Sequence, residues 1–353
     1  MNNLIRRNHY DVTDRVFVAD PRIVCQEVCS LLRVLGSNAD LRPVEQAFDV
    51  FGRLYAGTLP GYLGCETWYH DAQHSLDCAL VMARLLEGHE RGVAAAERLG
   101  ERRARLGVIV ALFHDAGYIR RSVDEEQHGA QFTLFHVRRS GDFLAGFLPS
   151  VGFAPETPLA EQLVHFTGFE MELDRIQVDH PLDRRLGFML GSADVLAQMS
   201  DRCYLEKCRD FLYAEFEICG LAGAPKPDGP KPLYASREEL LQRTPEFHDK
   251  IWKERMDGYF ERVYRHAATH FGGHNLYLKV IEGHLLRLRE VLRTNQIYEG
   301  LRRRADCVNA GPLRVILGLQ PTDDGSIRAA SRPPGYKRRT HAGAVDPRIY
   351  IPT

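Results

Sequence analysis

Apolar residues recur along most of this chain at the three- and four-residue spacing of amphipathic helices. Alternating patterns typical of strands extend over only a few residues, so the sequence predicts an all-α fold. Asp20–Pro21 has the N-cap and first-turn residues of a helix start, and Thr67 is the expected cap of a long helix carrying both His70 and His74. Ser122 and Glu125 form a capping-box pattern for a helix through Phe135. Helices are also expected over residues 20–36, 43–55, 159–166, 181–197, 204–219, 245–271 and 274–304.

One apolar segment ends in an unusual way. Residues 106–118 read LGVIVALFHDAGY, and the run from Val108 to Phe113 stops at His114 and Asp115. It follows residues 84–105, whose alanines and charged residues predict a mostly solvated stretch. Apolar residues at this density belong in a core, and a buried carboxylate is costly unless it is paired or coordinates a metal. Groups that compensate this charge are therefore expected elsewhere in the chain.

The overall composition excludes several classes of protein. The chain has 353 residues, of which 44% are hydrophobic and 26% charged, with a formal net charge of −1. These values are typical of a soluble globular protein and give no field that attracts nucleic acid or an anionic membrane. Without a transmembrane-length apolar run, a secretory leader or CxxC pairs among its eight cysteines, the chain is expected to be cytoplasmic with reduced thiols.

Several other polar residues interrupt apolar helical patterns. His70 and His74 are four residues apart, so both are expected on one helix face. The remaining ones are His128, His165 and Asp194. Each alone is more often a satisfied core or surface residue. Together with His114 and Asp115 they supply the imidazoles and carboxylates that a transition-metal site requires.

The order of these residues, His … His-Asp … His … His … Asp, resembles the HD superfamily of metal-dependent phosphohydrolases. Residues 69–77 (YHDAQHSLD) are also similar to the YHNxxHxxD motif of class I cyclic-nucleotide phosphodiesterases, with Asp71 in place of Asn. That family has His-Pro-Gly shortly after its HD pair, where this chain reads Tyr118-Ile119-Arg120. The likeness covers about residues 65–200. It implies an HD-domain helical bundle over residues 57–304, preceded by an N-terminal helical segment (1–56) and followed by an Arg/Pro/Gly-rich tail (305–353).

The resemblance also implies roles for individual residues. One or two divalent ions (Mn²⁺, Mg²⁺, Fe²⁺ or Zn²⁺) would bind, and Asp115 would bridge them. His70 matches the residue that protonates the leaving group in the phosphodiesterases. By the same likeness, the first metal would be held by His74, His114, Asp115 and Asp194, and the second by Asp115, His128 and His165.

The expected substrate is a small phosphoester, plausibly a nucleotide. Arg120 and Arg121 are candidates to bind its phosphate, although a surface pair after a turn is the alternative. Gln198 lies one turn after Asp194 and is expected either to contact substrate or to edge the core. Two other functions stay open: an HD-fold mixed-valent di-iron oxygenase, and a non-catalytic module that senses a nucleotide or metal. A homo-oligomer is also left open.

Overall fold

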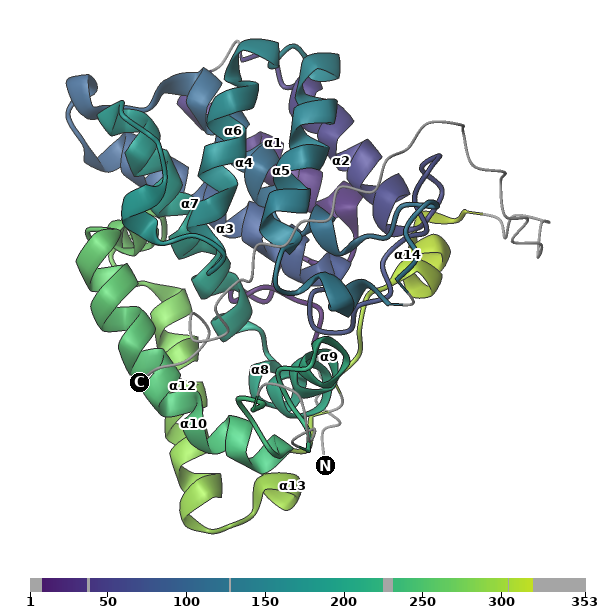
Figure 1. Cartoon of the computed structure of the whole chain (residues 1–353). Helices are drawn as coiled ribbons and strands as arrows, with labels where there is room; N and C mark the ends of the chain where they lie inside the picture. Colours follow the sequence, from purple (N-terminus) through teal and green to yellow (C-terminus); the bar gives the residue numbers. More distant parts are fainter. Residues whose placement is uncertain (1–7, 37–38, 127, 225–230, 304, 320–353) are drawn as a thin grey trace.

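The computed structural model describes residues 8–36, 39–126, 128–224, 231–303 and 305–319, and these form helices with no strand among them (Figure 1). The predicted all-α fold is confirmed. The longer helices are α1 (Pro21–Leu35), α2 (Arg42–Tyr55), α3 (Ala72–Gly92), α4 (Gly100–Phe113), α5 (His136–Phe147), α7 (Pro181–Ser200), α10 (Arg237–Ile251) and α12 (Leu276–Arg293). The shorter ones are α6 (Thr157–Leu163), α8 (Tyr204–Lys207), α9 (Tyr213–Cys219), α11 (His266–His270), α13 (Ile297–Gly300) and α14 (Ala310–Leu317). Among the described residues, no helix combines the length and apolar composition needed to cross a bilayer.

Helix α3 is the centre of the fold. It packs against α1, α4, α7 and α11, and every residue from its first, Ala72, to Glu90 is buried. The expectation that the chain becomes solvated at Arg84 is wrong. The Arg84 side chain is 2% exposed, and its guanidinium donates to Asp11 at 2.6 Å and to the Tyr277 hydroxyl at 2.8 Å. Because its charge is paired and hydrogen-bonded, the arginine can lie inside the core.

The start of α3 differs from the prediction. Asp71 is the N-cap, since its Oδ1 accepts a hydrogen bond from the His74 N–H at 3.0 Å. The Thr67 hydroxyl instead donates to the His70 carbonyl at 2.6 Å and closes a turn before the helix. His70 therefore precedes α3, and only His74 belongs to its first turn.

The capping box expected at Ser122 is also wrong. Residues 121–126 contain no helix, and α5 begins only at His136. The box belongs to His128 and Gln131 at the start of a short 3₁₀ turn, Gly129–Phe132. There His128 Nδ1 accepts from the Ala130 N–H at 3.1 Å, and Gln131 Oε1 accepts from the His128 N–H at 3.0 Å.

The C-terminal part of the described chain crosses the start of α3 and returns to the N-terminal helices. The Val308 N–H donates to Asp71 Oδ2 at 2.8 Å, and the Ala310 N–H donates to the Cys65 carbonyl at 3.0 Å. Helix α14 then lies against α2, where Arg314 donates to the Ala56 carbonyl. Residues 305–319 of the expected tail thus contact the body of the protein through buried residues such as Val308 and Leu313, while Val315 and several of its neighbours are exposed. The remainder, 320–353, lies outside the described residues.

The long helix expected over residues 245–271 is interrupted. Helix α10 continues as a π-helix (Trp252–Tyr259), after which Glu261 and Arg262 adopt φ values of 52° and 61°. Non-glycine residues seldom occupy this left-handed region, and two in succession end the helix. The chain then forms a 3₁₀ turn (Val263–Arg265) and continues into α11.

Candidate metal centre

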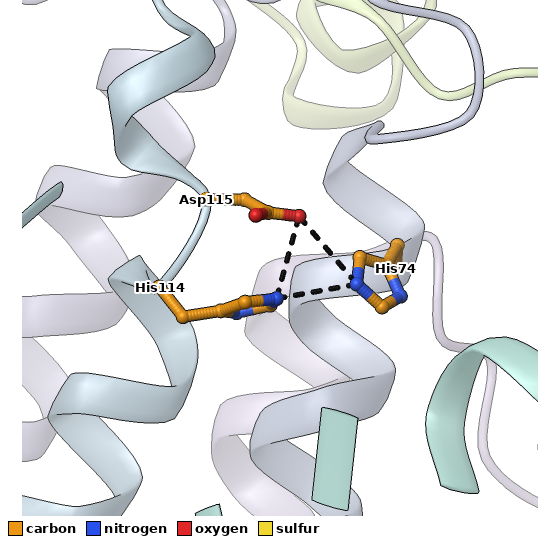
Figure 2. A group of neighbouring side chains, drawn as sticks. All are labelled: His74, His114 and Asp115. Atoms are coloured by element: carbon orange, nitrogen blue, oxygen red, sulfur yellow. Dashed lines mark hydrogen bonds and ion pairs between the residues drawn. The ribbon is translucent and has the colours of Figure 1, made fainter. Parts of the chain in front are cut away.

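Three helices bring four side chains to one buried point. His74 lies in the first turn of α3, His114 and Asp115 directly follow α4, and Asp194 lies in α7. Figure 2 shows the imidazoles of His74 and His114 and the carboxylate of Asp115 converging. His74 Nε2 is 3.2 Å from both His114 Nε2 and Asp194 Oδ1. Asp115 Oδ2 is 3.3 Å from His114 Nε2 and 3.5 Å from His74 Nε2.

Three of these atoms, on His74, His114 and Asp115, form a group that could hold a divalent metal ion. Ligands at about 2.0–2.2 Å from a tetrahedral ion lie about 3.3–3.6 Å from one another, close to the separations of 3.2 Å, 3.3 Å and 3.5 Å among these three atoms. Asp194 Oδ1 lies beside the group, 3.2 Å from His74 Nε2 and 3.6 Å from His114 Nε2. Asp115 Oδ2 is buried and accepts no hydrogen bond of good geometry, as is expected of an oxygen placed to bind a cation. His114 Nδ1 donates to the Ala111 carbonyl at 2.8 Å, so its Nε2 presents a lone pair to the group.

The electrostatics of the cluster also favour a cation. Burial raises the pKa of Asp115 and Asp194, but the neighbouring imidazoles, His114 foremost, lower both by more and hold them well below their ordinary value. Burial lowers the pKa of His114, yet the Asp115 carboxylate outweighs it and the pKa lies well above its ordinary range. Both carboxylates stay ionised in a dry interior, and a metal ion would take over the charge that a proton otherwise supplies.

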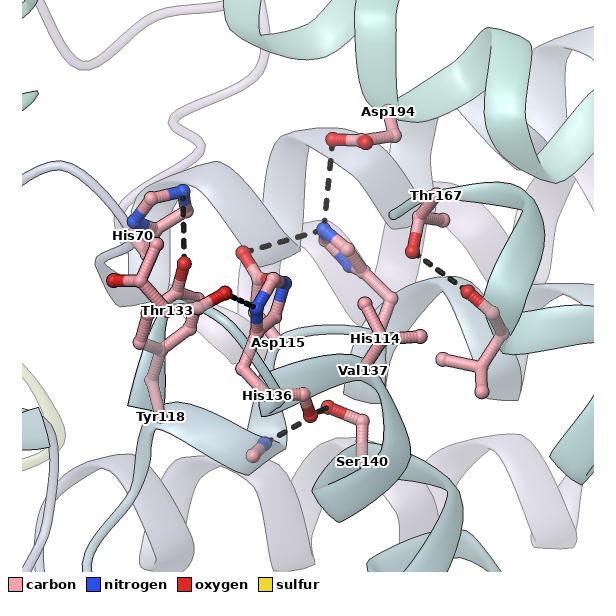
Figure 3. A network of polar contacts seen from close by, with 12 residues as sticks. His70, His114, Asp115, Tyr118, Thr133, His136, Val137, Ser140, Thr167 and Asp194 are labelled. Carbon is pink, nitrogen blue, oxygen red and sulfur yellow. Dashed lines mark hydrogen bonds and ion pairs between the residues drawn. The ribbon is translucent and has the colours of Figure 1, made fainter. Parts of the chain in front are cut away.

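A fifth ligand candidate, His136, was missed by the sequence analysis. Its Nε2 lies 3.5 Å from Asp115 Oδ1, the oxygen that faces away from the four-atom group (Figure 3). Its Nδ1 donates to the Thr133 carbonyl at 2.8 Å, and burial lowers its pKa to about 4, so the ring is neutral near pH 7. Asp115 and His136 could therefore hold a second ion. The sequence does contain a pattern that could have identified His136: this residue interrupts the apolar sequence around Phe135 and Val137, just as His114 ends an apolar run.

The two histidines that the family likeness suggested for the second metal do not line the cavity at this cluster. His128 is occupied as the cap described above, and its ring packs on Trp68 with centroids 4.9 Å apart. His165 lies in a short 3₁₀ turn (Val164–Phe166), where its Nδ1 is buried without a hydrogen bond. The order of residues along the chain suggested both, but the turns that carry them direct them elsewhere.

The two arginines suggested for phosphate binding also lie outside the cavity lining. Arg120 pairs with Glu66 and donates to the Glu126 carbonyl, whereas the half-exposed Arg121 lies 3.7 Å from Asp142. Gln198 does line the cavity. Its Nε2 donates to Asp194 Oδ1 at 3.2 Å, so it orients a metal-ligand candidate and lies beside the space a substrate would enter.

His70 faces the same cavity from the segment before α3. Its Nδ1 lies 2.6 Å from Glu215 Oε2, and Glu215 is fully buried in α9. The other oxygen, Glu215 Oε1, accepts the Trp68 and Tyr69 N–H groups, both at 2.6 Å. Burial lowers the pKa of His70, but the charge of Glu215 raises it by more, so the net pKa lies above its ordinary value. Sequence reasoning missed Glu215, which looks like any charged residue of an amphipathic helix.

Tyr118 connects His70 with the metal-ligand candidates. Its ring stacks on His70 and on His136, with centroids 4.3 Å apart in both pairs (Figure 3). Its hydroxyl lies 3.5 Å from His70 Nε2. The His70 ring is 6.3 Å from that of His74 and 6.1 Å from that of His136. His70 and the ligand candidates His74 and His136 thus lie within one ring-to-ring spacing on the lining of the same cavity.

These residues line one cavity with a volume of about 120 Å³. Comparison of the chain with family models, with curated proteins and with solved structures finds no match. The site must therefore be interpreted from its own geometry.

The placement of His136 gives a direct test. After saturation with Mn²⁺ and desalting, the His136→Ala variant is expected to retain about one ion less per chain than the wild type. The reason is that the second ion would lose the imidazole that helps Asp115 Oδ1 to hold it. Elemental analysis measures the ratio. His128→Ala and His165→Ala are the matched controls and should retain the wild-type ratio. A wild-type ratio in His136→Ala together with a reduced ratio in either control would restore the assignment suggested by the family likeness.

Proposed function

We propose that this chain is a metal-dependent phosphohydrolase that cleaves a small phosphoester with water. The observation that carries the proposal is the position of His70. A buried carboxylate orients its imidazole, and the ring lines the same cavity as a cluster with the donor set of a divalent metal site. A metal-binding cluster alone has many uses, whereas a cluster opposite an oriented proton donor suits hydrolysis.

The ligand residues would divide between two positions. His74, His114, Asp194 and Asp115 Oδ2 would hold one ion, and Asp115 Oδ1 with His136 would help to hold another. Divalent ions bound there would polarise a phosphoryl oxygen and lower the pKa of a coordinated water. Gln198 keeps Asp194 in position, and the Ala111 and Thr133 carbonyls fix the rings of His114 and His136.

His70 supplies the proton that the leaving group needs. In the reaction, a water oxygen forms a bond to phosphorus and the bond from phosphorus to the ester oxygen breaks, leaving its electron pair on that oxygen. Since Glu215 accepts from Nδ1, the proton available to the leaving oxygen is the one on Nε2, which faces the cavity beside Tyr118. The products are an alcohol and phosphate, or a phosphomonoester if the substrate is a diester.

The structure favours this function over the di-iron oxygenase. The oxygenase alternative relied on the same four histidines and two aspartates that the family likeness suggests as metal ligands. Of these six, the described cavity lining contains His74, His114, Asp115 and Asp194 but neither His128 nor His165. Another histidine of the lining, His70, is bound to Glu215 and serves better as a proton donor than as a ligand.

The test is a hydrolysis assay. Purified protein loaded with Mn²⁺, Mg²⁺, Fe²⁺ or Zn²⁺ is expected to release product from bis-p-nitrophenyl phosphate or from members of a phosphoester panel, and chelation should abolish the activity. Restoration by one of the metals excludes a contaminating metal-independent phosphatase. Absence of turnover with every metal and every ester would contradict the proposal and favour the sensing module.

A further inference from the structure

The part of the cavity farther from the metal-ligand candidates is lined by a different set of side chains. There its described walls come from the loop after α6, the π-helix Cys208–Leu212, α9, the segment before α10, and α10 itself. Six apolar side chains lie there, which we call the apolar arm of the cavity: Phe169, Leu212, Phe216, Leu233, Leu240 and Phe247. Thr167, Cys208, Tyr234 and Thr244 line the same walls. Two residues of the apolar arm, Phe169 and Phe247, contact each other with ring centroids 6.4 Å apart.

No lysine or arginine occurs among the described residues that line this cavity. Two arginines outside the lining are hydrogen-bonded to backbone carbonyls of lining residues. Arg255 donates to the Gly168 carbonyl and lies over the Phe169 ring at 3.9 Å, and Arg243 donates to the Leu233 carbonyl. A substrate with two or three phosphates would bring several negative charges and meet side-chain cations only at the histidines and the ions. The lining therefore suits a substrate with a single phosphate group.

The lining is also poor in groups that read a nucleobase. Gln198 is the one side-chain amide among its described residues, and Asp194 and the Tyr69 hydroxyl already engage it. The Thr244 hydroxyl, on the arm side, donates to the Leu240 carbonyl within its own helix. The buried polar edges of a base would thus find no free side-chain amide among the described lining residues, and each group left unpaired would weaken binding by about 5–150-fold.

The size of the cavity is compatible with such a substrate. A cavity of about 120 Å³ is on the order of ten times the ~10–15 Å³ needed for one water molecule. It therefore accommodates a phosphate with a ring-sized organic group. Burying one aromatic ring in the arm would contribute about 1.5–3 kcal/mol to binding, which corresponds to about 10–100-fold in affinity.

We infer that the substrate is a phosphoester with one phosphate group and a small apolar organic group, aryl-alkyl or branched alkyl, that occupies the apolar arm. This inference rests on the proposed function and replaces the nucleotide expected from the family likeness. The phosphate lies at the metal-ligand candidates and His70, and the organic group lies against Phe169, Phe216 and Phe247. Hydrolysis by water then gives phosphate and an apolar alcohol.

Binding is tested first, with probes that are not cleaved. Benzylphosphonate and methylphosphonate carry the same phosphonate group and differ in the ring. The ratio of their affinities for Mn²⁺-loaded protein, measured by titration calorimetry, therefore reports the contribution of the apolar arm. We expect benzylphosphonate to bind at least about tenfold tighter than methylphosphonate. Phe247→Ala and Phe169→Ala should remove most of this ratio. Trp252→Ala is the matched aromatic control, since Trp252 stacks on His248 outside the cavity and should leave the ratio unchanged.

Turnover is tested second, with benzyl phosphate, glycerol 2-phosphate and adenosine 5′-monophosphate. The first two are of similar size and have alkoxide leaving groups, so they differ mainly in polarity. We expect kcat/KM for benzyl phosphate to exceed both others by about tenfold or more. A preference for the nucleotide or for glycerol phosphate, with equal binding of the two phosphonates, would overturn the inference while the hydrolase proposal stands. Tight binding of benzylphosphonate without turnover of any ester would support the apolar arm and contradict the hydrolase.

Discussion

Replacing Asp115 with asparagine is expected to lower kcat/KM for any phosphoester substrate by about 1000-fold or more and to reduce bound metal. One carboxylate oxygen lies within 3.5 Å of the His74 and His114 nitrogens, and the other faces His136 at 3.5 Å. An asparagine of the same shape keeps one oxygen and loses the charge, so it cannot serve both positions. Activity assays with elemental analysis of the same samples measure both effects.

A matched control is available a few residues further along the chain. Asp124 is also largely buried, but its carboxylate accepts from Arg139 and from the Arg121 N–H outside the cavity. Asp124→Asn is expected to retain metal and activity even if it lowers stability. Full metal content and activity in Asp115→Asn would show that the centre is misplaced. Equal losses in both variants would indicate a general folding defect.

The fold was predictable where local signals were unambiguous. Asp20 caps α1 through the Arg22 N–H, and Pro181 begins α7, both as the sequence predicts. The errors occur where several residues could serve as the cap. Thr67 and Asp71 are both good N-caps, and the choice of Asp71 depends on the Val308 N–H, which arrives from more than two hundred residues away to bind its second oxygen. No local pattern contains that contact.

At the candidate site, too, local sequence patterns identified only part of the arrangement. His114 and Asp115 stood out because an apolar run ended in polar residues, and His74 and Asp194 because they interrupted buried helices. The structure places all four together. His128 and His165 were chosen by order along the chain, and order does not determine where a turn directs its side chain. His136 and Glu215 become recognisable only through their partners, Asp115 and His70. Candidate ligands on or directly after well-defined helices were thus predictable, whereas residues that depend on loop geometry were not.

His70→Gln is expected to lower kcat by about 10²–10⁴-fold while the metal content stays at the wild-type level. Glutamine can occupy the space of the imidazole but cannot transfer a proton to the leaving oxygen. The effect should shrink with p-nitrophenyl esters, whose leaving group needs little protonation, and should be largest with alkyl esters. His128→Gln is the control, because His128 lies outside the cavity and should retain full kcat.

Glu215→Gln separates the proton donor from its orienting partner. The variant keeps the oxygen that accepts the Trp68 and Tyr69 N–H groups but removes the charge that raises the pKa of His70. Under the proposed function, activity requires protonated His70, so it should decline as pH rises through that pKa. With the charge gone, burial lowers the pKa, and the alkaline limb of the kcat profile should move to lower pH. A purely structural role for Glu215 would reduce activity equally at every pH. Loss of metal in His70→Gln would make His70 a ligand and remove the argument for hydrolysis that its position supplies.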